Sequence, residues 1–145
     1  MSFHPLDAVD ERGQRIGVIA VIERQGRLLV IRRAAGIRKE GKICFPGGGL
    51  RIAESEADGV RREVAEELGA AIEPLRRIET SRSPWGTSLS WWHCHLVRPA
   101  RFRLDPKEIA EMFWEEAASL LEHPDLLESN APFLRSLVDG RLRLD

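Results

Sequence analysis

Three glutamates close together in the chain, Glu63, Glu66 and Glu67, are the residues best suited to do chemistry. A glycine run at 47–49 and a further acid, Glu54, precede them. Like charges at helical spacing cost only roughly a few tenths of a kcal/mol, so their repulsion alone decides nothing. Carboxylates are, however, ligands that Mg²⁺ prefers, and glycines let the backbone approach a phosphate or lend a carbonyl to a cation. The segment therefore indicates a divalent-metal site beside a space for phosphate.

A helix must position these glutamates. We expect it from about residue 54 or 55 to residue 68, because Ser55 followed by Asp58 resembles a capping box and Gly69 fits the left-handed position that ends helices. Its buried face would consist of apolar residues at helical spacing: Ala57, Val60, Val64 and Leu68. Glu56, Glu63 and Glu67 lie within about 40° of one another around this helix, with Glu66 at the edge of that arc. The helix is expected to pack by one side and to present acid on the other.

Strands and further helices are predicted on both sides of this segment. Runs of apolar and β-branched residues predict strands at 16–22, 27–31, 43–45, 71–78, 88–97 and 112–114. Gln25-Gly26 would join the first two strands as a hairpin, and residues 46–49 would form a turn. Residues 81–86 and 99–111 indicate loops, and amphipathic helices are expected at 116–121 and 131–138. We therefore expect an α/β (α+β) fold, a mixed β-sheet sandwiched between helices, in a single domain spanning residues 1–145.

The composition excludes several classes of protein. Among the 145 residues, 22 basic residues against 23 acidic ones leave a net charge of -1, so no global field favours a nucleic acid partner. Residues 1–5 lack the basic start and apolar run of a signal peptide, and no stretch approaches the roughly 20 apolar residues of a membrane span. We expect a cytoplasmic protein that does not bind membranes.

The two cysteines, Cys44 and Cys94, show no paired spacing. His93 and His95 flank Cys94, which would suit a metal site. On a strand, however, the two histidines would share one face and Cys94 would point to the other. Two reduced cysteines in strands are the prediction.

A known family carries the same pattern of glycines and charges. Gly48, five residues, Glu54, seven residues, and then Arg62-Glu63-Val64-x-Glu66-Glu67-x-Gly69-Ala70 resembles the Nudix box, in which every charged and glycine position is matched. The hairpin before Phe45-Pro46-Gly47-Gly48 and the tryptophan-plus-helix ending are similar as well. The resemblance implies a Nudix fold of the MutT-like kind. It also implies hydrolysis of a phosphoric anhydride bond in a nucleoside diphosphate linked to another group, with Mg²⁺, or alternatively Mn²⁺, as cofactor.

The resemblance also implies roles for individual residues. Glu66 and Glu67 match the principal metal ligands, and Glu63 matches a further ligand or the base that activates water. Gly47 matches a glycine whose carbonyl reaches the metal, and Glu54 with Arg62 matches a pair that holds the loop against the helix. Many relatives carry Glu and Gly where this chain has Arg51 and Ala53, so Arg51 could instead meet a substrate phosphate.

A fourth carboxylate near the metal is expected from the loop before Trp114. Glu108 lies six residues before this tryptophan, the spacing at which some MutT-like relatives place such a glutamate. Glu111 is its rival, and both could equally be exposed loop acids.

The sequence says less about the substrate, which we expect to be a small nucleotide. Trp85 lies in a Gly/Pro-containing loop and is the best candidate to stack on a base, since Trp91 and Trp92 point to opposite faces of a strand. Arg33 and Arg38, with Arg32, could hold phosphates or could be ordinary surface residues.

Several alternatives stay open at this stage. They are a nucleotide-sensing module without catalysis, an RNA-end pyrophosphohydrolase and a coenzyme A pyrophosphohydrolase, whose arginine pattern is matched with one residue missing between Arg38 and Gly41. The sequence also leaves open a homodimer.

Overall fold

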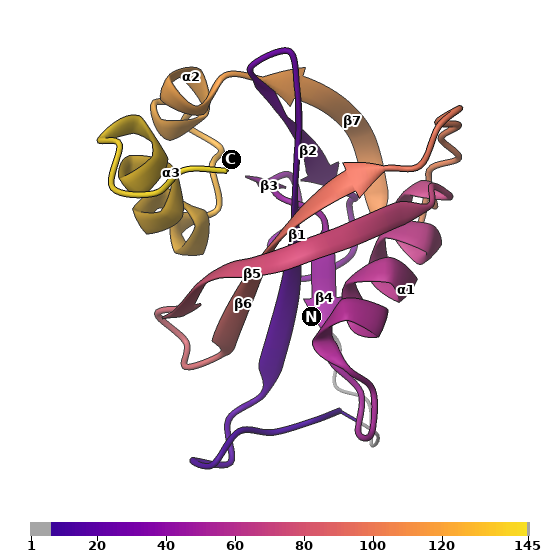
Figure 1. Cartoon of the computed structure of the whole chain (residues 1–145), viewed down its shortest axis with the longest axis vertical. Coiled ribbons are helices and arrows are strands. Elements are labelled where there is room, and N and C mark those ends of the chain that lie inside the picture. Colours follow the sequence, from indigo (N-terminus) through magenta and orange to yellow (C-terminus); the bar gives the residue numbers. More distant parts are fainter. Residues whose placement is uncertain (1–6, 145) are drawn as a thin grey trace.

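A seven-stranded mixed sheet forms the centre of the computed structural model, which describes residues 7–144 (Figure 1). The absence of a signal peptide, predicted from residues 1–5, lies outside the described residues. The strands are β1 (Ile16–Arg24), β2 (Arg27–Arg33), β3 (Ile43–Cys44), β4 (Gly47–Gly49), β5 (Ile72–Arg82), β6 (Ser88–Leu96) and β7 (Ile109–Glu115). The helices are α1 (Glu56–Leu68), α2 (Ala117–Leu121) and α3 (Ala131–Val138), with a short 3₁₀ turn η1 (Glu128–Asn130) before α3.

Helices lie on both faces of the sheet, as the sequence predicts. The strand order is β3-β2-β1-β6-β5, with β4 paired to β1 and β7 paired to β2. Helix α1 covers one side, and α2 and α3 cover the other (Figure 1). The predicted mixed sheet between helices is therefore confirmed.

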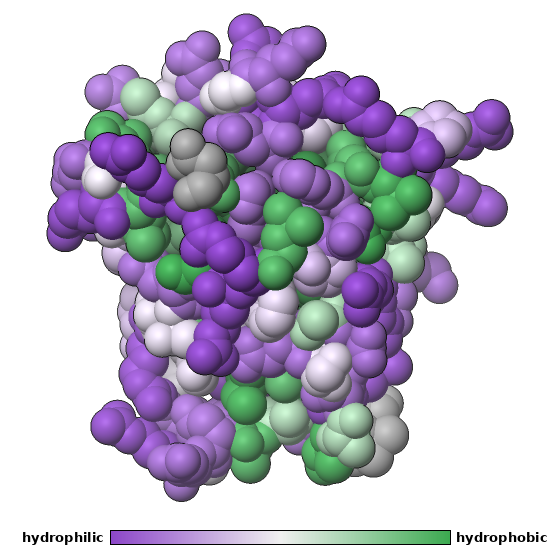
Figure 2. Space-filling model, viewed as in Figure 1, coloured by the Kyte–Doolittle hydropathy of each residue, from purple (hydrophilic) through white to green (hydrophobic). Residues whose placement is uncertain are grey.

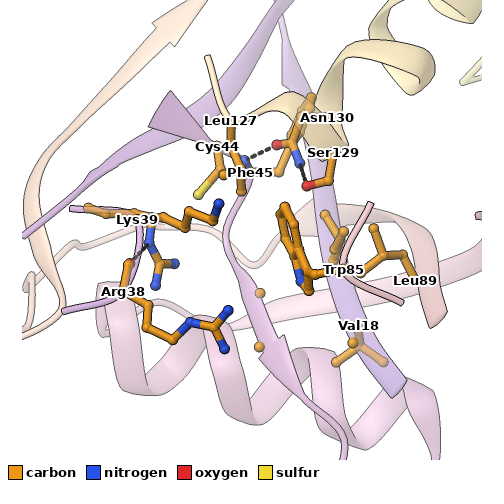
Figure 3. Close-up of a pocket in the computed structure, with 15 residues that line it drawn as sticks. Val18, Arg38, Lys39, Cys44, Phe45, Trp85, Leu89, Leu127, Ser129 and Asn130 are labelled. Carbon is orange, nitrogen blue, oxygen red and sulfur yellow. Dashed lines mark hydrogen bonds between the residues drawn. The ribbon is translucent and has the colours of Figure 1, made fainter. Parts of the chain in front are cut away.

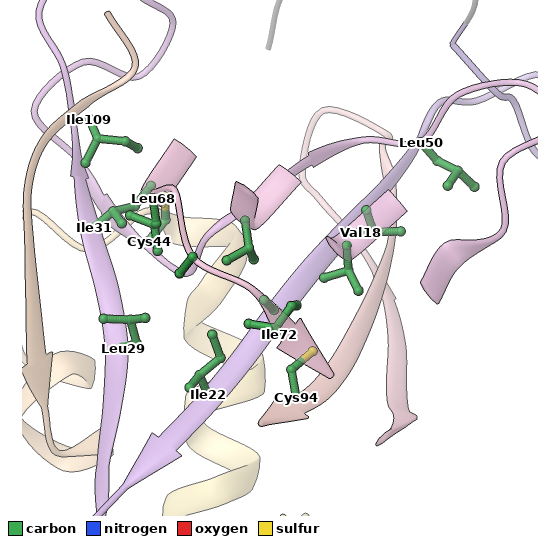
Figure 4. Close-up of a cluster of buried hydrophobic side chains, with 14 residues drawn as sticks. Val18, Ile22, Leu29, Ile31, Cys44, Leu50, Leu68, Ile72, Cys94 and Ile109 are labelled. Carbon is green, nitrogen blue, oxygen red and sulfur yellow. The ribbon is translucent and has the colours of Figure 1, made fainter. Parts of the chain in front are cut away.

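The central strand β1 is buried on both faces, which explains its continuous run of apolar residues. Val18 and Ala20 belong to the core beneath α1, together with Val60 and Val64 of that helix (Figure 4 shows part of this cluster). The alternate residue Ile19 belongs to the core beneath α2 and α3. Because successive side chains of a strand point to opposite faces, one strand supplies both cores.

Helix α1 begins and ends as its sequence predicts. The side chain of Ser55 accepts a hydrogen bond from the amide of Asp58 at 3.1 Å, which caps the first turn. Gly69 adopts a left-handed conformation with φ of 64° and ends the helix.

The predicted turn at residues 46–49 is wrong in part, because Gly47–Gly49 forms strand β4 antiparallel to β1. A side chain on Gly47 would overlap the carbonyl oxygen of Val18, so only glycine permits this pairing. Two predicted loops are also shorter than expected. Strand β5 continues to Arg82 beside β6, and β7 begins at Ile109 beside β2.

The aromatic residues of the second core connect the sheet to α3. The rings of Trp91 and Phe133 stack with centroids 4.2 Å apart and planes within 3° of parallel. Phe45 meets both rings edge-on, at 5.6 and 5.7 Å. The predicted placement of the cysteines is confirmed, since Cys44 and Cys94 are buried free thiols in β3 and β6.

The face of the molecule that is turned to the viewer in Figure 1 is largely hydrophilic, and the hydrophobic residues on it form small separate patches (Figure 2). Within residues 7–144, no helix has the length and apolar character needed to cross a membrane.

Replacing Phe133 by alanine should destabilise the fold by about 3–5 kcal/mol, because it removes a fully buried ring from a packed aromatic cluster. Urea unfolding followed by circular dichroism measures the change. Leu75→Ala is the matched control, since Leu75 is 42% exposed and its removal should cost little. Equal effects of the two substitutions would contradict the structural role given to the cluster.

Candidate active site

The guanidinium of Arg62 ties the loop before α1 to the helix and to β4. Its Nε donates to Glu54 Oε2 at 2.7 Å, and its Nη2 donates to Glu54 Oε1 at 3.0 Å and to the carbonyl of Gly49 at 2.9 Å. Its Nη1 donates to Glu63 at 2.9 Å and to Glu66 at 3.3 Å. A bidentate arginine–carboxylate pair, such as that of Arg62 and Glu54, fixes both the distance between the two side chains and their relative orientation. The loop and three acids are therefore held by one side chain.

Next to Arg62 lies an acidic cleft between α1, β4 and the segment before β7. Its lining residues are Asp7, Arg15, Arg33, Gly47, Gly48, Gly49, Arg51, Arg62, Glu63, Glu66, Glu67, Asp105 and Glu108. Asp7 and Arg15 form an ion pair at its edge. The cleft therefore combines carboxylates with several arginines at its walls.

The three helix glutamates differ in environment. Glu67 is only 6% exposed, and its Oε1 accepts a hydrogen bond from the amide of Gly47 at 3.0 Å. The side chain of Glu63 is 13% exposed, whereas that of Glu66 is 50% exposed and also lies 3.8 Å from Arg51. The expectation that the helix presents its acids away from the packed side is thus wrong for Glu67, which is buried against β4.

Burial and mutual repulsion act on these carboxyl groups. Burial, followed by the charge of Glu63, raises the pKa of Glu67 well above its ordinary value, despite the amide of Gly47. Burial likewise raises the pKa of Glu63, although Arg62 opposes the shift. Both groups would be relieved by a positive charge among them.

The donor set fits a divalent cation. Clustered carboxylate oxygens beside a glycine backbone are ligands of the kind that Mg²⁺ takes. Within residues 7–144 no three acidic, histidine or cysteine side chains already stand in a metal-holding arrangement. The carboxylates have protein donors instead, since Arg62 holds Glu63 and Glu66 while the Gly47 amide holds Glu67. At Gly47, the group bonded to Glu67 is therefore the N–H and not the carbonyl.

Gly48 is needed where the backbone passes the acids. A side chain at this position would overlap the carboxylate of Glu63. The glycine thus lets strand β4 approach the helix closely enough to form one wall of the cleft.

The two candidate acids before Trp114 are placed differently. Glu108 lines the acidic cleft, and its charge acts on the pKa of both Glu63 and Glu67, raising each. Glu111 instead forms an ion pair with Arg32 at 2.9 Å. Arg32 also donates to the carbonyl of Gly41 and pairs with Asp125, so it braces a loop and does not reach the cleft.

An apolar pocket adjoins the acidic cleft. Its lining includes Val18, Phe45, Leu89, Leu127 and Arg33. Trp85 lies at one side of the pocket, and the cations Arg38 and Lys39 lie at another (Figure 3). Ser129 and Asn130 lie at one end of the pocket, and Arg38 lies at the other (Figure 3). Arg33, Gly47 and Gly48 line both the pocket and the cleft, so the two form one continuous site.

Two loops meet across this pocket. The Nζ atom of Lys39 lies 4.6 Å from the ring centroid of Trp85, whose surface is 37% exposed. The Nε of Arg33 donates to the carbonyl of Arg38 at 2.8 Å, which holds the loop that carries Arg38 and Lys39.

The structure brings most of the sequence-predicted residues to this site. Arg33, Arg38 and Trp85 line the pocket; Arg33, Arg51, Arg62, Glu63, Glu66, Glu67, Gly47 and Glu108 line the cleft; and Glu54 lies behind Arg62. Glu56, placed in the same arc by helical spacing, does not line the cleft; its carboxylate accepts from Trp92 Nε1 at 2.9 Å and lies 3.5 Å from Arg77.

Sequence reasoning did not find Lys39, Ser129 or Asn130. Asn130 reaches the pocket because its side chain accepts from the amide of Phe45, 85 residues earlier in the chain. No local pattern signals such a contact. The one sequence signal that could have pointed to Lys39 is the cluster of basic residues in the loop before β3.

Comparison with known proteins gives consistent matches. The NUDIX domain family matches residues 11–137. A CTP pyrophosphohydrolase from Escherichia coli (strain K12) is 26% identical over 121 residues, which are 83% of this chain and 89% of that protein. A MutT-like protein from Streptomyces ambofaciens is 40% identical over 70 residues, 48% of this chain and 43% of that protein. The crystal structure of the MutT protein from Methanosarcina mazei Go1 superposes with a TM-score of 0.75 at 25% identity, covering 88% of this chain and 95% of that one.

The bond between Glu54 and Arg62 predicts a pH-dependent stability. Hydrogen bonding to Arg62 lowers the pKa of Glu54, so the ionised group stabilises the folded state above its unfolded pKa of about 4.3, and this contribution is lost as the pH falls further. Glu54→Gln should therefore cost about 1–2 kcal/mol at neutral pH, and less in acid. Thermal unfolding between neutral and acidic pH measures the difference. The exposed Glu122→Gln is the control, and a pH-independent loss in Glu54→Gln would contradict the ion-pair argument.

Proposed function

Because the chain belongs to the NUDIX family, whose members are hydrolases of phosphoric anhydride bonds in small nucleotides, we propose that it is a divalent-metal-dependent pyrophosphohydrolase cleaving a nucleoside diphosphate linked to another group. The continuity of the acidic cleft with the apolar pocket is the observation that carries this proposal. A nucleotide has an apolar, stackable base at one end and a multiply charged phosphate chain at the other. The site offers matching surroundings to each end.

The carboxylates of Glu63, Glu66 and Glu67 would hold the cation, with Mg²⁺ as the first choice and Mn²⁺ as the alternative. When bound, such an ion neutralises phosphate charge and lowers the pKa of a coordinated water. Arg62 keeps Glu63 and Glu66 in place, and Glu54 in turn fixes Arg62. This pair acts by positioning the acids.

Arginines at the walls of the cleft and the pocket would bind the phosphate chain. Arg33 stands at the junction of cleft and pocket, where the first phosphates after the ribose would pass. Arg51 is 44% exposed at the rim beside Glu66 and would meet a distal phosphate. Arg38 lies on the pocket side and would contact the ribose or a phosphate near it.

Glu63 and Glu108 are the candidates to accept the proton of the attacking water. Arg62 occupies Glu63 Oε1, whereas within residues 7–144 the carboxylate of Glu108 forms no ion pair. An exposed carboxylate that is free to turn toward water suits proton transfer. Glu108 is our first choice, and Glu63 is the second.

One relative, from E. coli, is named a CTP pyrophosphohydrolase. This similarity favours a nucleoside triphosphate over a nucleotide sugar as the substrate of the present chain. A panel of nucleoside triphosphates, oxidised ones included, with nucleoside diphosphate sugars, ADP-ribose, NADH and coenzyme A tests the whole range. A chain that binds one of these and turns over none would be a sensing module instead.

Glu67→Gln should lower turnover at least about a hundredfold, because it removes a ligand of the cation. Folding should be kept, since a neutral amide is easier to bury than the Glu67 carboxylate. Release of phosphate or pyrophosphate in Mg²⁺ and thermal unfolding in EDTA measure the two effects. Glu111→Gln is the control because Glu111 lies outside the cleft. Equal turnover by Glu67→Gln and the unmodified protein would reject the metal assignment.

Trp85→Ala should raise KM by about tenfold while kcat changes little, as expected where a base loses its stacking partner but the phosphates stay in place. Trp85→Phe, which keeps an aromatic face, should recover most of the affinity. Steady-state kinetics on the preferred nucleotide measure both constants. An unchanged KM in Trp85→Ala would remove this residue from the binding site.

A further inference from the structure

The side chain of Lys39 lies over the ring of Trp85, and both residues line the apolar pocket. In Figure 3 the lysine extends toward the tryptophan from the side on which Arg38 lies, and Leu89 lies on the other side of the ring. Within residues 7–144 the ammonium group of Lys39 forms no ion pair. The protein group that stabilises its charge is therefore the aromatic face.

The loop holds the backbone of Lys39 in an unfavourable conformation. Its φ is 56°, in the left-handed region that residues with a side chain rarely adopt. The amide of Lys42 donates to the carbonyl of Lys39 at 3.2 Å, and Arg33 Nε donates to the carbonyl of Arg38 at 2.8 Å. Such strain persists where surrounding contacts impose it, and it is concentrated at functional sites. These bonds fix the point from which the flexible lysine side chain extends.

The ammonium group stands where a stacked base would lie. Atoms of stacked rings pack at about 3.5–4.0 Å from one another, and Lys39 Nζ lies 4.6 Å from the centroid of the Trp85 ring. A base and this ammonium group cannot occupy the same face of the ring together. A base that stacks on this face of Trp85 therefore has to displace Lys39.

A displaced ammonium group needs a new partner. In the part of the chain that the structure describes, no acidic side chain lines the pocket, and its other charged groups are Arg33 and Arg38. The pocket joins the cleft at Arg33, where the phosphate next to the ribose would pass. A nucleotide thus offers the ammonium group a charge-assisted bond in exchange for the ring face, whereas a nucleoside offers none.

We propose that Lys39 is a substrate-binding residue that exchanges partners, from the face of Trp85 in the free protein to the phosphate next to the ribose in the complex. Because of this exchange, a base enters the pocket readily only when a phosphate accompanies it. Lys39 therefore discriminates nucleotides from nucleosides, whatever the base. The inference rests on the proposed function for the kind of ligand, a nucleotide, and does not depend on its hydrolysis.

NMR titrations of isotope-labelled protein with the four common ribonucleosides and with their monophosphates test the exchange. The indole N–H signal of Trp85, identified by its loss in Trp85→Phe, reports weak binding at this ring and needs no turnover. Lys39→Met removes the charge and keeps the length of the side chain. It should bind nucleosides about two- to fivefold more tightly, because the competing ammonium group is gone. It should bind the monophosphates about three- to thirtyfold more weakly, because a charge-assisted bond is lost.

Lys42→Met is the matched control, because Lys42 lies in the same loop but lines neither the pocket nor the cleft. It should leave both affinities close to those of the unmodified protein. Lys39→Arg keeps a cation for both partners and should retain most of the preference for monophosphates. If Lys39→Met fails to fold, Lys39→Gly takes its place with the same expected changes, since glycine adopts a left-handed φ without strain.

Opposite changes in the affinities for nucleosides and monophosphates would support the exchange. Nucleoside binding that is unchanged or weaker without the lysine side chain, unchanged monophosphate binding, or a Trp85 signal that none of the ligands shifts would overturn it. Opposite changes without turnover of any nucleotide would support the exchange and reject the proposed hydrolysis. Turnover combined with unaltered affinities would reject the exchange and leave the proposed hydrolysis standing.

Discussion

Arg62 is the contact on which the geometry of the site depends. One guanidinium bonds Glu54 of the loop, Glu63 and Glu66 of α1 and the carbonyl of Gly49 in β4. It is a half-buried charge, and its desolvation is offset because carboxylates surround it. Without it, the acids would face one another with little compensation, and the loop would lose its attachment to the helix. The arginine therefore supports the fold and the candidate catalytic groups at once.

The cluster of helix glutamates also lowers the stability of the folded chain. Glu67 is buried beside Glu63, and burial raises the pKa of both carboxyl groups, so the folded chain disfavours their charged forms. Apolar residues at these positions would pack more favourably. Their retention makes sense if the cleft must offer negative charge to a cation, a familiar conflict between stability and function. Ala53 is a smaller case, because it adopts a left-handed φ of 64° in the loop, a conformation that is strained for any residue with a side chain.

Whether the sequence could predict a feature depends on how far apart in the chain the residues that determine it lie. The cap at Ser55, the end at Gly69 and the helix between them depend on neighbouring residues, and all three were predicted. Strand β4 was missed because its pairing with β1 requires a partner some thirty residues away, and glycines alone indicate a turn. Helical spacing put Glu56 with the other acids, but Trp92 on a distant strand takes its carboxylate. Asn130 was missed because it bonds Phe45 across 85 residues.

The two ends of the site differ in the same way, one being formed mainly by residues close in the chain and the other by residues far apart. The helix glutamates, Glu54 and Arg62 all come from one continuous stretch, β4 to α1, so they keep their spacing in any chain that folds this way; the segment before β7 adds Glu108 to them. The pocket end is assembled from the loop before β3, the turn between β5 and β6, and η1, which tertiary packing brings together. The stacked rings of Trp91 and Phe133 hold α3, and with it the preceding η1, against the sheet. A substitution in η1 or at Trp85 can thus alter the pocket while the acids and Arg62 stay in register, because within residues 7–144 the linings of the two ends have only Arg33, Gly47 and Gly48 in common.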